Sequence, residues 1–105
     1  MCTLTQYTYG RELQNVILQG TLSKDAEPFL DESREVSCRL TVRTQHLHVV
    51  SNADISAQAL YTVEITEKSL HRLLFHYARK GSAVFIPGLL MPCGKKIRAH
   101  LVYPA

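Results

Sequence analysis

Several kinds of residue are missing or scarce in this chain of 105 residues. It has no tryptophan, and its 5 glycines and 4 prolines are too few for a collagen-like or low-complexity sequence. A hydrophobic fraction of 46% excludes a wholly disordered chain. No apolar run approaches the roughly 18–20 residues that span a bilayer, and the first residues lack the basic and apolar segments of a secretory signal. The length therefore predicts one packed domain without a membrane partner.

Sequence motifs for disulfides, metal binding and catalysis are also missing. The 3 cysteines form no C-x-x-C pair, so we expect no disulfide framework and a reducing, cytoplasmic location. No cysteine or histidine pair has the spacing of a structural zinc motif, and neither a G-x-S-x-G elbow nor a phosphate-binding loop occurs. The sequence thus predicts no metal, no cofactor and no enzymatic activity.

Acidic residues are missing from the last third of the chain. Residues 68–105 hold seven Lys or Arg and no acid, a net charge of +7, whereas residues 1–67 hold five basic residues and all 9 acids, a net charge of −4. Such asymmetry indicates a polyanionic partner such as nucleic acid. The alternative is a solvated helix face followed by a basic turn, because charge informs about partners and not about fold.

What is present is a pattern of short strands. Alternating or β-branched apolar residues predict strands at 15–22, 36–44, 60–65, 82–90 and 97–103. Residues 23–33 are expected to form a loop, and residues 46–57 a long connection that could hold a further strand at 47–50. Gly20 predicts a bulge or bend within the first strand, and Pro87 places the fourth strand at an edge or a bulge.

One helix is predicted between the third and fourth strands. Its apolar residues recur as on one face of a helix, at Leu70, Leu73, Leu74, Tyr77 and Ala78. Thr66 can cap its start, and Gly81 stands where a left-handed residue ends a helix.

This order predicts an all-β protein: a five-stranded Greek-key barrel with one α-helix between strands 3 and 4. An antiparallel sheet of five short strands has two unpaired edges, and closure into a barrel removes them. The helix can then cover the open end of the barrel. The arrangement is that of the OB fold, which commonly binds oligonucleotides. Small sandwiches and SH3-like barrels remain alternatives on order alone.

Four segments resemble bacterial single-stranded DNA-binding proteins, the SSB family. Residues 15–27, NVILQGTLSKDAE, resemble the opening strand and turn, N-x-V-x-L-x-G-x-L-x-x-D-P-E, and residues 40–44, LTVRT, resemble the second strand. Residues 61–65, YTVEI, resemble the third strand, and residues 77–88, YARKGSAVFIPG, resemble the signature Y-x-x-K-G-S-x-V-x-V-x-G. The resemblance implies an OB fold, homo-oligomers (a dimer or tetramer), and sequence-independent binding of single-stranded DNA in replication, recombination or repair.

The chain departs from the family in its aromatic residues. Tyr61 falls where the family often has a tryptophan that stacks on bases, but it could equally face the barrel with Val63 and Ile65. The hairpin that carries another aromatic in the family is shortened to residues 91–96, and no acidic tail follows Ala105. In length the chain is similar to PriB, a short primosomal relative. The alternative function is therefore a PriB-like or diverged OB module that binds replication or primosome proteins, with secondary nucleic-acid binding.

A binder of single strands needs cations along the phosphates and flat side chains for the bases. The sequence predicts such nucleic-acid-binding residues at seven positions: Lys24, Arg39, Arg43, Tyr61, Lys95, Lys96 and Arg98. Phe85 and Tyr103 are further candidates for stacking. A single surface lysine is more often a solubilising charge, whereas an arginine on a strand is held rigidly and both stacks and pairs bidentately. The predicted domains are residues 1–14, an N-terminal arm or edge strand, and residues 15–105, the DNA-binding OB domain.

Overall fold

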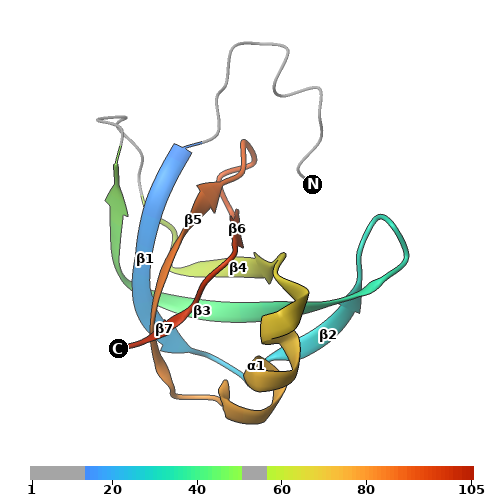
Figure 1. Cartoon of the computed structure of the whole chain (residues 1–105). Coiled ribbons are helices and arrows are strands. Elements are labelled where there is room, and N and C mark those ends of the chain that lie inside the picture. The colour runs from blue at the N-terminus through green and yellow to red at the C-terminus, as the bar shows by residue number, and fades with distance from the viewer. Residues whose placement is uncertain (1–13, 51–56) are drawn as a thin grey trace.

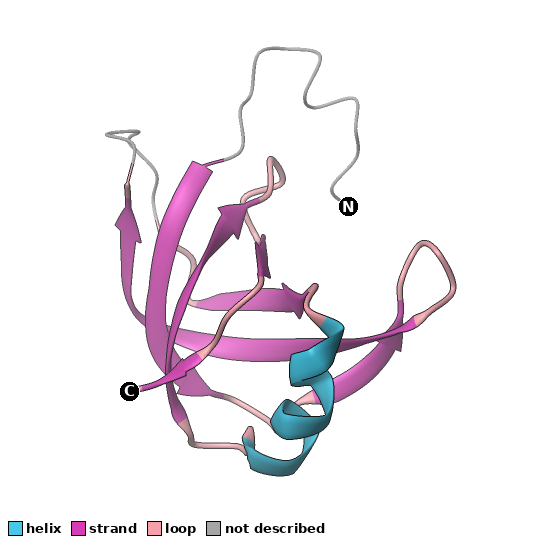
Figure 2. Ribbon diagram, in the orientation of Figure 1, coloured by secondary structure: helices cyan, strands magenta, loops and turns pink. Residues whose placement is uncertain are grey.

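The described part of the chain forms seven strands and one short helix. The computed structural model describes residues 14–50 and 57–105. In chain order the elements are β1 (Gln14–Leu22), β2 (Glu27–Leu30), β3 (Val36–Val49), β4 (Leu60–Ile65), the 3-10 turn η2 (Lys68–Leu70), α1 (His71–Tyr77), β5 (Ala83–Leu90), β6 (Lys96–Ala99) and β7 (Tyr103–Pro104) (Figure 1 and Figure 2). No helix among these described residues is long and apolar enough to cross a membrane. The arm predicted over residues 1–14 lies, apart from Gln14, outside the described residues.

Five strands close into a barrel because β1 is paired along both of its edges. The hydrogen-bonded order is β1-β3-β4-β6-β5, and β5 pairs back with β1. The β4–β6 pair is parallel, while the other four pairs of the barrel are antiparallel. The expectation of an entirely antiparallel sheet was therefore wrong at this one pair. This closed barrel, with its helix between the third and fourth barrel strands, is the predicted OB fold.

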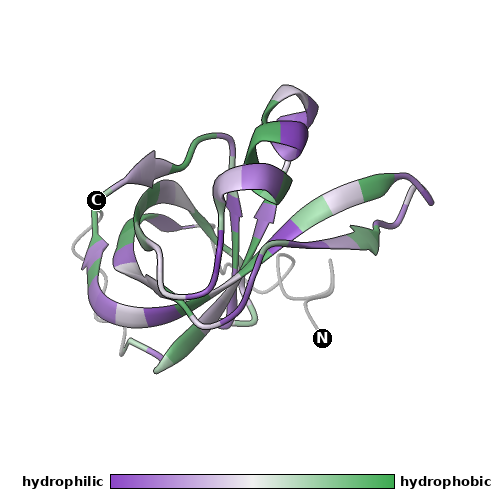
Figure 3. Ribbon diagram, turned by 90° about the horizontal axis from the view of Figure 1, so that it is seen from below, coloured by the Kyte–Doolittle hydropathy of each residue, from purple (hydrophilic) through white to green (hydrophobic). Residues whose placement is uncertain are grey.

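The barrel interior is filled by alternate residues of each strand. Figure 3 shows hydrophobic and hydrophilic residues in bands along the strands, as expected when one face is buried and the other is solvated. On β3 and β4 the inward residues are no more than 1% exposed: Cys38, Leu40, Val42, Tyr61, Val63 and Ile65. The residues between them point outward and carry most of the polar groups.

The helix buries a narrower face than its apolar pattern predicts. Leu74 and Ala78 join the core cluster, whereas Leu73 and Tyr77 are 52% and 66% exposed. The seven-residue helix contacts the barrel with one side only. Leu73 and Tyr77, along one edge of the predicted apolar stripe, therefore face solvent. The 3-10 turn η2, which precedes the helix, is capped by Glu67 and not by Thr66: the Glu67 carboxylate accepts a hydrogen bond from the backbone N–H of Ser69.

The connection predicted over residues 46–57 begins with the second half of β3. This strand continues to Val49 and pairs with Val16–Gln19 of β1 after a register shift between Gln19 and Gly20. The shift confirms the bulge predicted at Gly20. Gln45 is the extra residue of β3 at the bulge, and it puts the alternation before and after it out of phase. That phase change explains why the sequence pattern stops at Thr44.

Two further differences concern strand edges. β2 was predicted as loop because of Pro28, but it pairs only with β3, and proline is tolerated on such an edge. The predicted last strand is split: β6 pairs with β4 and with Gly88–Leu90, and β7 pairs with Val84 and Phe85. Pro87 lies between these two pairings, where β5 has β1 on one side and no paired strand on the other, as its missing donor requires.

Replacing Gly20 with alanine should destabilise the barrel. A Cβ at this position would lie 2.1 Å from the carbonyl oxygen of Arg43, which is backbone and cannot move aside easily. We expect the free energy of unfolding to fall by roughly 1–3 kcal/mol, as for other overpacked sites, measured by urea denaturation followed by circular dichroism. The matched control is Gln19→Ala at the neighbouring exposed position, which should change stability little. Equal stability of the two variants would contradict the close approach.

Candidate nucleic-acid interface

Three charged residues from neighbouring strands form one row on the outside of the barrel. Arg39 of β3 is in register with Glu64 of β4, and Glu64 is in register with Arg98 of β6. Lys96 lies two residues before Arg98 and therefore points to the same side of its strand. In OB folds the face formed by the second and third barrel strands, here β3 and β4, commonly binds oligonucleotides together with the loops at its ends.

A groove of about 430 Å³ lies over this row. One wall is formed by β2 and the turn that follows it, and the opposite wall by β6. Its aromatic and charged lining residues are Phe29, Asp31, Glu32, Arg39, Glu64, Lys68, Lys96 and Arg98. In Figure 1, β2 and the start of β3 extend as a hairpin to one side of the barrel.

Phe29 and Arg39 form a stacked pair at the hairpin side of the groove. The guanidinium carbon lies 4.2 Å from the centroid of the phenyl ring, a cation–π contact. The two residues come from paired strands, since Glu27 is in register with Arg39 and Phe29 with Ser37. Nε of Arg39 is buried and has no hydrogen-bond partner among the described residues. A buried donor of this kind costs free energy unless an acceptor is supplied.

Glu64 is the acid at the centre of the groove. Its carboxylate lies 3.1 Å from Nζ of Lys96 and 3.8 Å from Nε of Arg98, and its side chain is only 11% exposed. Among the described residues it is the sole acid on the outward face of β3, β4 and β6. Four cations, Arg39, Arg43, Lys96 and Arg98, share this face, so its net charge is positive.

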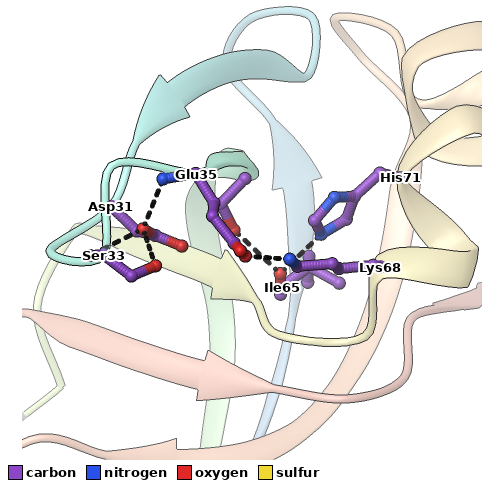
Figure 4. Close-up of polar contacts among 7 residues, drawn as sticks. Asp31, Ser33, Glu35, Ile65, Lys68 and His71 are labelled. Atoms are coloured by element: carbon purple, nitrogen blue, oxygen red, sulfur yellow. Dashed lines mark hydrogen bonds and ion pairs between the residues drawn. The ribbon is translucent and has the colours of Figure 1, made fainter.

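The hairpin turn beside the groove is held by a compact set of polar contacts (Figure 4). Oδ1 of Asp31 accepts hydrogen bonds from the backbone N–H of Ser33 at 2.9 Å, from its hydroxyl at 2.6 Å and from the backbone N–H of Glu35 at 3.0 Å. Glu35 in turn forms an ion pair with Lys68 at the start of η2. These contacts fix the wall of the groove to the segment that precedes the helix.

The predicted site residues are only partly brought together. Arg39, Lys96 and Arg98 line the groove. Arg43 lies on the same face of β3, exposed and beyond Thr41, and Lys95 is exposed in the turn before β6. Lys24 lies in the turn before β2, outside the groove, and its ammonium is 3.2 Å from the Glu27 carboxylate.

Tyr61 is a correction to the predicted site. The side chain is 1% exposed and belongs to the core, on the same face of β4 as Val63 and Ile65. Its hydroxyl accepts a hydrogen bond from the backbone N–H of Gln58 at 3.0 Å. A ring in this position cannot reach a base, so of the two roles left open for Tyr61 the structure selects core packing.

Phe29 and Glu64 are among the groove residues that were not predicted from the sequence. Phe29 was hidden in a segment predicted as loop, although an aromatic residue next to Leu30 is itself a weak strand signal. Glu64 occupies an outward position of a strand that was correctly predicted. Its position on the same outer face as Arg39 of β3 followed from the alternation, but Glu64 was not among the predicted site residues. Both residues obtain their partners from other strands.

Groups with shifted pKa lie outside the groove. The backbone N–H of Lys80, followed by Arg79, lowers the pKa of the exposed Asp25 carboxyl. The backbone N–H and hydroxyl of Ser69 lower the pKa of Glu67. Burial raises the pKa of the Cys38 thiol to about 11, so this thiol stays protonated at neutral pH. These shifts favour structural charges and an inert thiol over a proton donor or a nucleophile.

No family model and no curated protein sequence matches this chain. Among solved structures it is similar to Rim1, the mitochondrial single-stranded DNA-binding protein of S. cerevisiae, with a TM-score of 0.68 and 9% sequence identity. The superposition covers 90% of this chain and 95% of that chain. At this identity the likeness shows a shared fold, and the chain is an OB-fold protein. The part of the sequence resemblance that points to a bacterial, PriB-like form stays a prediction.

Removing the hydroxyl of Tyr61 should affect stability and leave nucleic-acid binding unchanged. Tyr61→Phe keeps the ring in the core and deletes one hydrogen bond, which contributes about 0.5–1.5 kcal/mol. We expect a loss of that size in thermal unfolding, with an unaltered affinity for a dT oligomer in fluorescence anisotropy. A weaker affinity with unchanged stability would place Tyr61 at the bases after all.

Proposed function

We propose that this protein binds single-stranded DNA independently of sequence, through the groove on the outward face of β3, β4 and β6. The observation that carries the proposal is the meeting of Arg39, Lys96 and Arg98 with Phe29 in that one groove. Cations that follow the phosphates and a ring on which a base can stack are the two requirements of such a site. We further propose a cytoplasmic role in DNA replication, recombination or repair.

The proposed contacts follow from the chemistry of each wall. Lys96 and Arg98 on β6 bind phosphates, and Lys95 and Arg43 extend the positive surface beyond the end of the groove at which β4 begins. A base stacks against the Phe29–Arg39 pair, because a guanidinium plane and a phenyl ring accept any base. The unpartnered Nε of Arg39 obtains an acceptor from a phosphate or base oxygen of the strand.

The structural neighbour supports this proposal through the shared fold. Rim1 is named as a single-stranded DNA-binding protein, and the two chains superpose over nearly their whole lengths. The groove of a single barrel is short, so we propose that the protein acts as a homodimer or homotetramer, in which several grooves hold one strand with higher avidity. Exposed Phe85 and Tyr103, whose ring centroids are 6.4 Å apart, offer apolar area for such an assembly or for a further base.

A second candidate function is a protein-interaction module of a primosome or replication complex. The observation that favours it is the exposed apolar side of α1, where Leu73 and Tyr77 border a hollow of about 570 Å³ together with Arg72 and His76. DNA binding would then be secondary. The two functions differ in what they require of the groove, so titration with DNA separates them.

The proposal predicts salt-dependent binding that needs Arg39. In fluorescence anisotropy with labelled dT oligomers, the wild-type protein should bind at low salt, and the logarithm of its affinity should fall linearly with the logarithm of salt concentration. Arg39→Gln should weaken binding and reduce the slope by roughly 0.7 for the one phosphate that is no longer neutralised. Arg72→Gln, which removes the same charge from the exposed side of α1, is the control and should leave the slope unchanged. Absence of wild-type binding at low salt would defeat the DNA-binding proposal and leave the second function.

The aromatic wall generates a separate prediction. Phe29→Leu keeps an apolar side chain at the hairpin but removes the ring, so affinity should fall by the value of one stacked base, roughly 1–3 kcal/mol, with little change in the salt slope. Tyr77→Leu removes an exposed ring from α1 and is the matched control. If both variants bind dT oligomers as the wild type does, Phe29 is not a stacking residue.

A further inference from the structure

We propose that Glu64, the acid of the groove that pairs with Lys96 and Arg98, competes with the strand for these two cations and thereby sets the affinity of the site. The inference rests on the proposed function and adds to it a residue that regulates the same groove. It concerns a side chain that the predicted set of binding residues does not contain.

The geometry of the row carries the argument. Glu64 stands between Arg39 and Arg98 in the β3–β4–β6 register, with Lys96 on the neighbouring diagonal. Its two ion pairs, at 3.1 Å to Lys96 and 3.8 Å to Arg98, engage the two cations of the β6 wall that a phosphate would contact. A carboxylate and a phosphate oxygen are acceptors of the same kind for these donors.

The low exposure of Glu64 makes this competition strong. With its side chain 11% exposed, the carboxylate is screened by solvent much less than an exposed ion pair outside the groove, such as Lys24–Glu27, whose side chains are 54% and 37% exposed. A phosphate that enters the groove meets both a negative charge that repels it and two cations whose charge Glu64 partly offsets. Strand binding therefore requires Lys96 and Arg98 to turn from Glu64 toward the phosphate, and Glu64 limits how much each of these cations contributes to affinity.

The test compares Glu64→Gln with the wild type in anisotropy titrations with a labelled dT oligomer across salt. Glutamine keeps the shape and loses the charge. We expect about tenfold tighter binding at low salt, because like charges facing each other in an interface are strongly unfavourable. The salt slope should be steeper by roughly 0.7 for each phosphate that the released cations neutralise. Asp25→Asn is the control: it also removes one carboxylate that pairs with an arginine, Arg79, but outside the groove.

A double-mutant cycle separates competition from support of the fold. In a background with Lys96→Gln and Arg98→Gln, the additional change Glu64→Gln should strengthen binding by less than it does in the wild type, because the cations for which Glu64 competes are gone and only its direct repulsion of the strand remains. Binding by Glu64→Gln that is weaker than wild type, or equal to that of Asp25→Asn, would overturn the inference and assign Glu64 to holding the cations in place. If Glu64→Gln binds and the wild-type protein does not, the inference stands and the proposed function of the wild-type protein fails. If neither the wild type nor Glu64→Gln binds, both the inference and the proposed function fail.

Discussion

The pairing of β1 along both of its edges is the constraint on which the rest of the structure depends. β1 runs against β3 and β5 at once, and that double pairing turns a sheet with two edges into a closed wall. Closure requires close backbone approach at two points: a Cβ at Gly20 would meet the Arg43 carbonyl oxygen at 2.1 Å, and one at Gly88 would meet that of Arg98 at 2.6 Å. The two glycines thus allow the backbone of β1 to approach β3, and that of β5 to approach β6, without a side chain in the way.

Closure also explains how a chain divided by charge forms a mixed site. The acid-rich part ends at residue 67, and everything after it is free of acids. The parallel β4–β6 pair joins these two parts side by side and places Glu64 next to Arg98. The mixture of acidic and basic residues in the groove is therefore a product of topology, because β4 supplies the acid and β6 the cations.

The fold could be predicted from the sequence wherever burial makes apolar and polar residues alternate regularly. The site could be predicted only for residues whose position depends on a single strand. Alternation placed Arg39 on the outer face of its strand and Tyr61 on the same face as Val63. The resemblance to base-stacking proteins instead suggested that Tyr61 contacts bases. The structure agrees with the alternation, because Tyr61 is buried. The second half of β3 was predicted only as a possible separate strand at 47–50, because the bulge at Gln45 breaks the phase. The contact of Phe29 with Arg39 depends on a register between two strands, which no local pattern encodes.

The turn between β2 and β3 affects how the protein meets a charged ligand as well as how the groove is built. It carries Asp31, Glu32 and Glu35 against a single arginine, Arg34, and Asp31 and Glu32 line the wall of the groove that faces Lys96 and Arg98 of β6. Charges of opposite sign on the two walls direct the electric field across the groove. A polyanion that approaches is attracted to the β6 wall and repelled by the turn, so the turn biases the side from which a strand enters, an effect measured by association rates at low ionic strength.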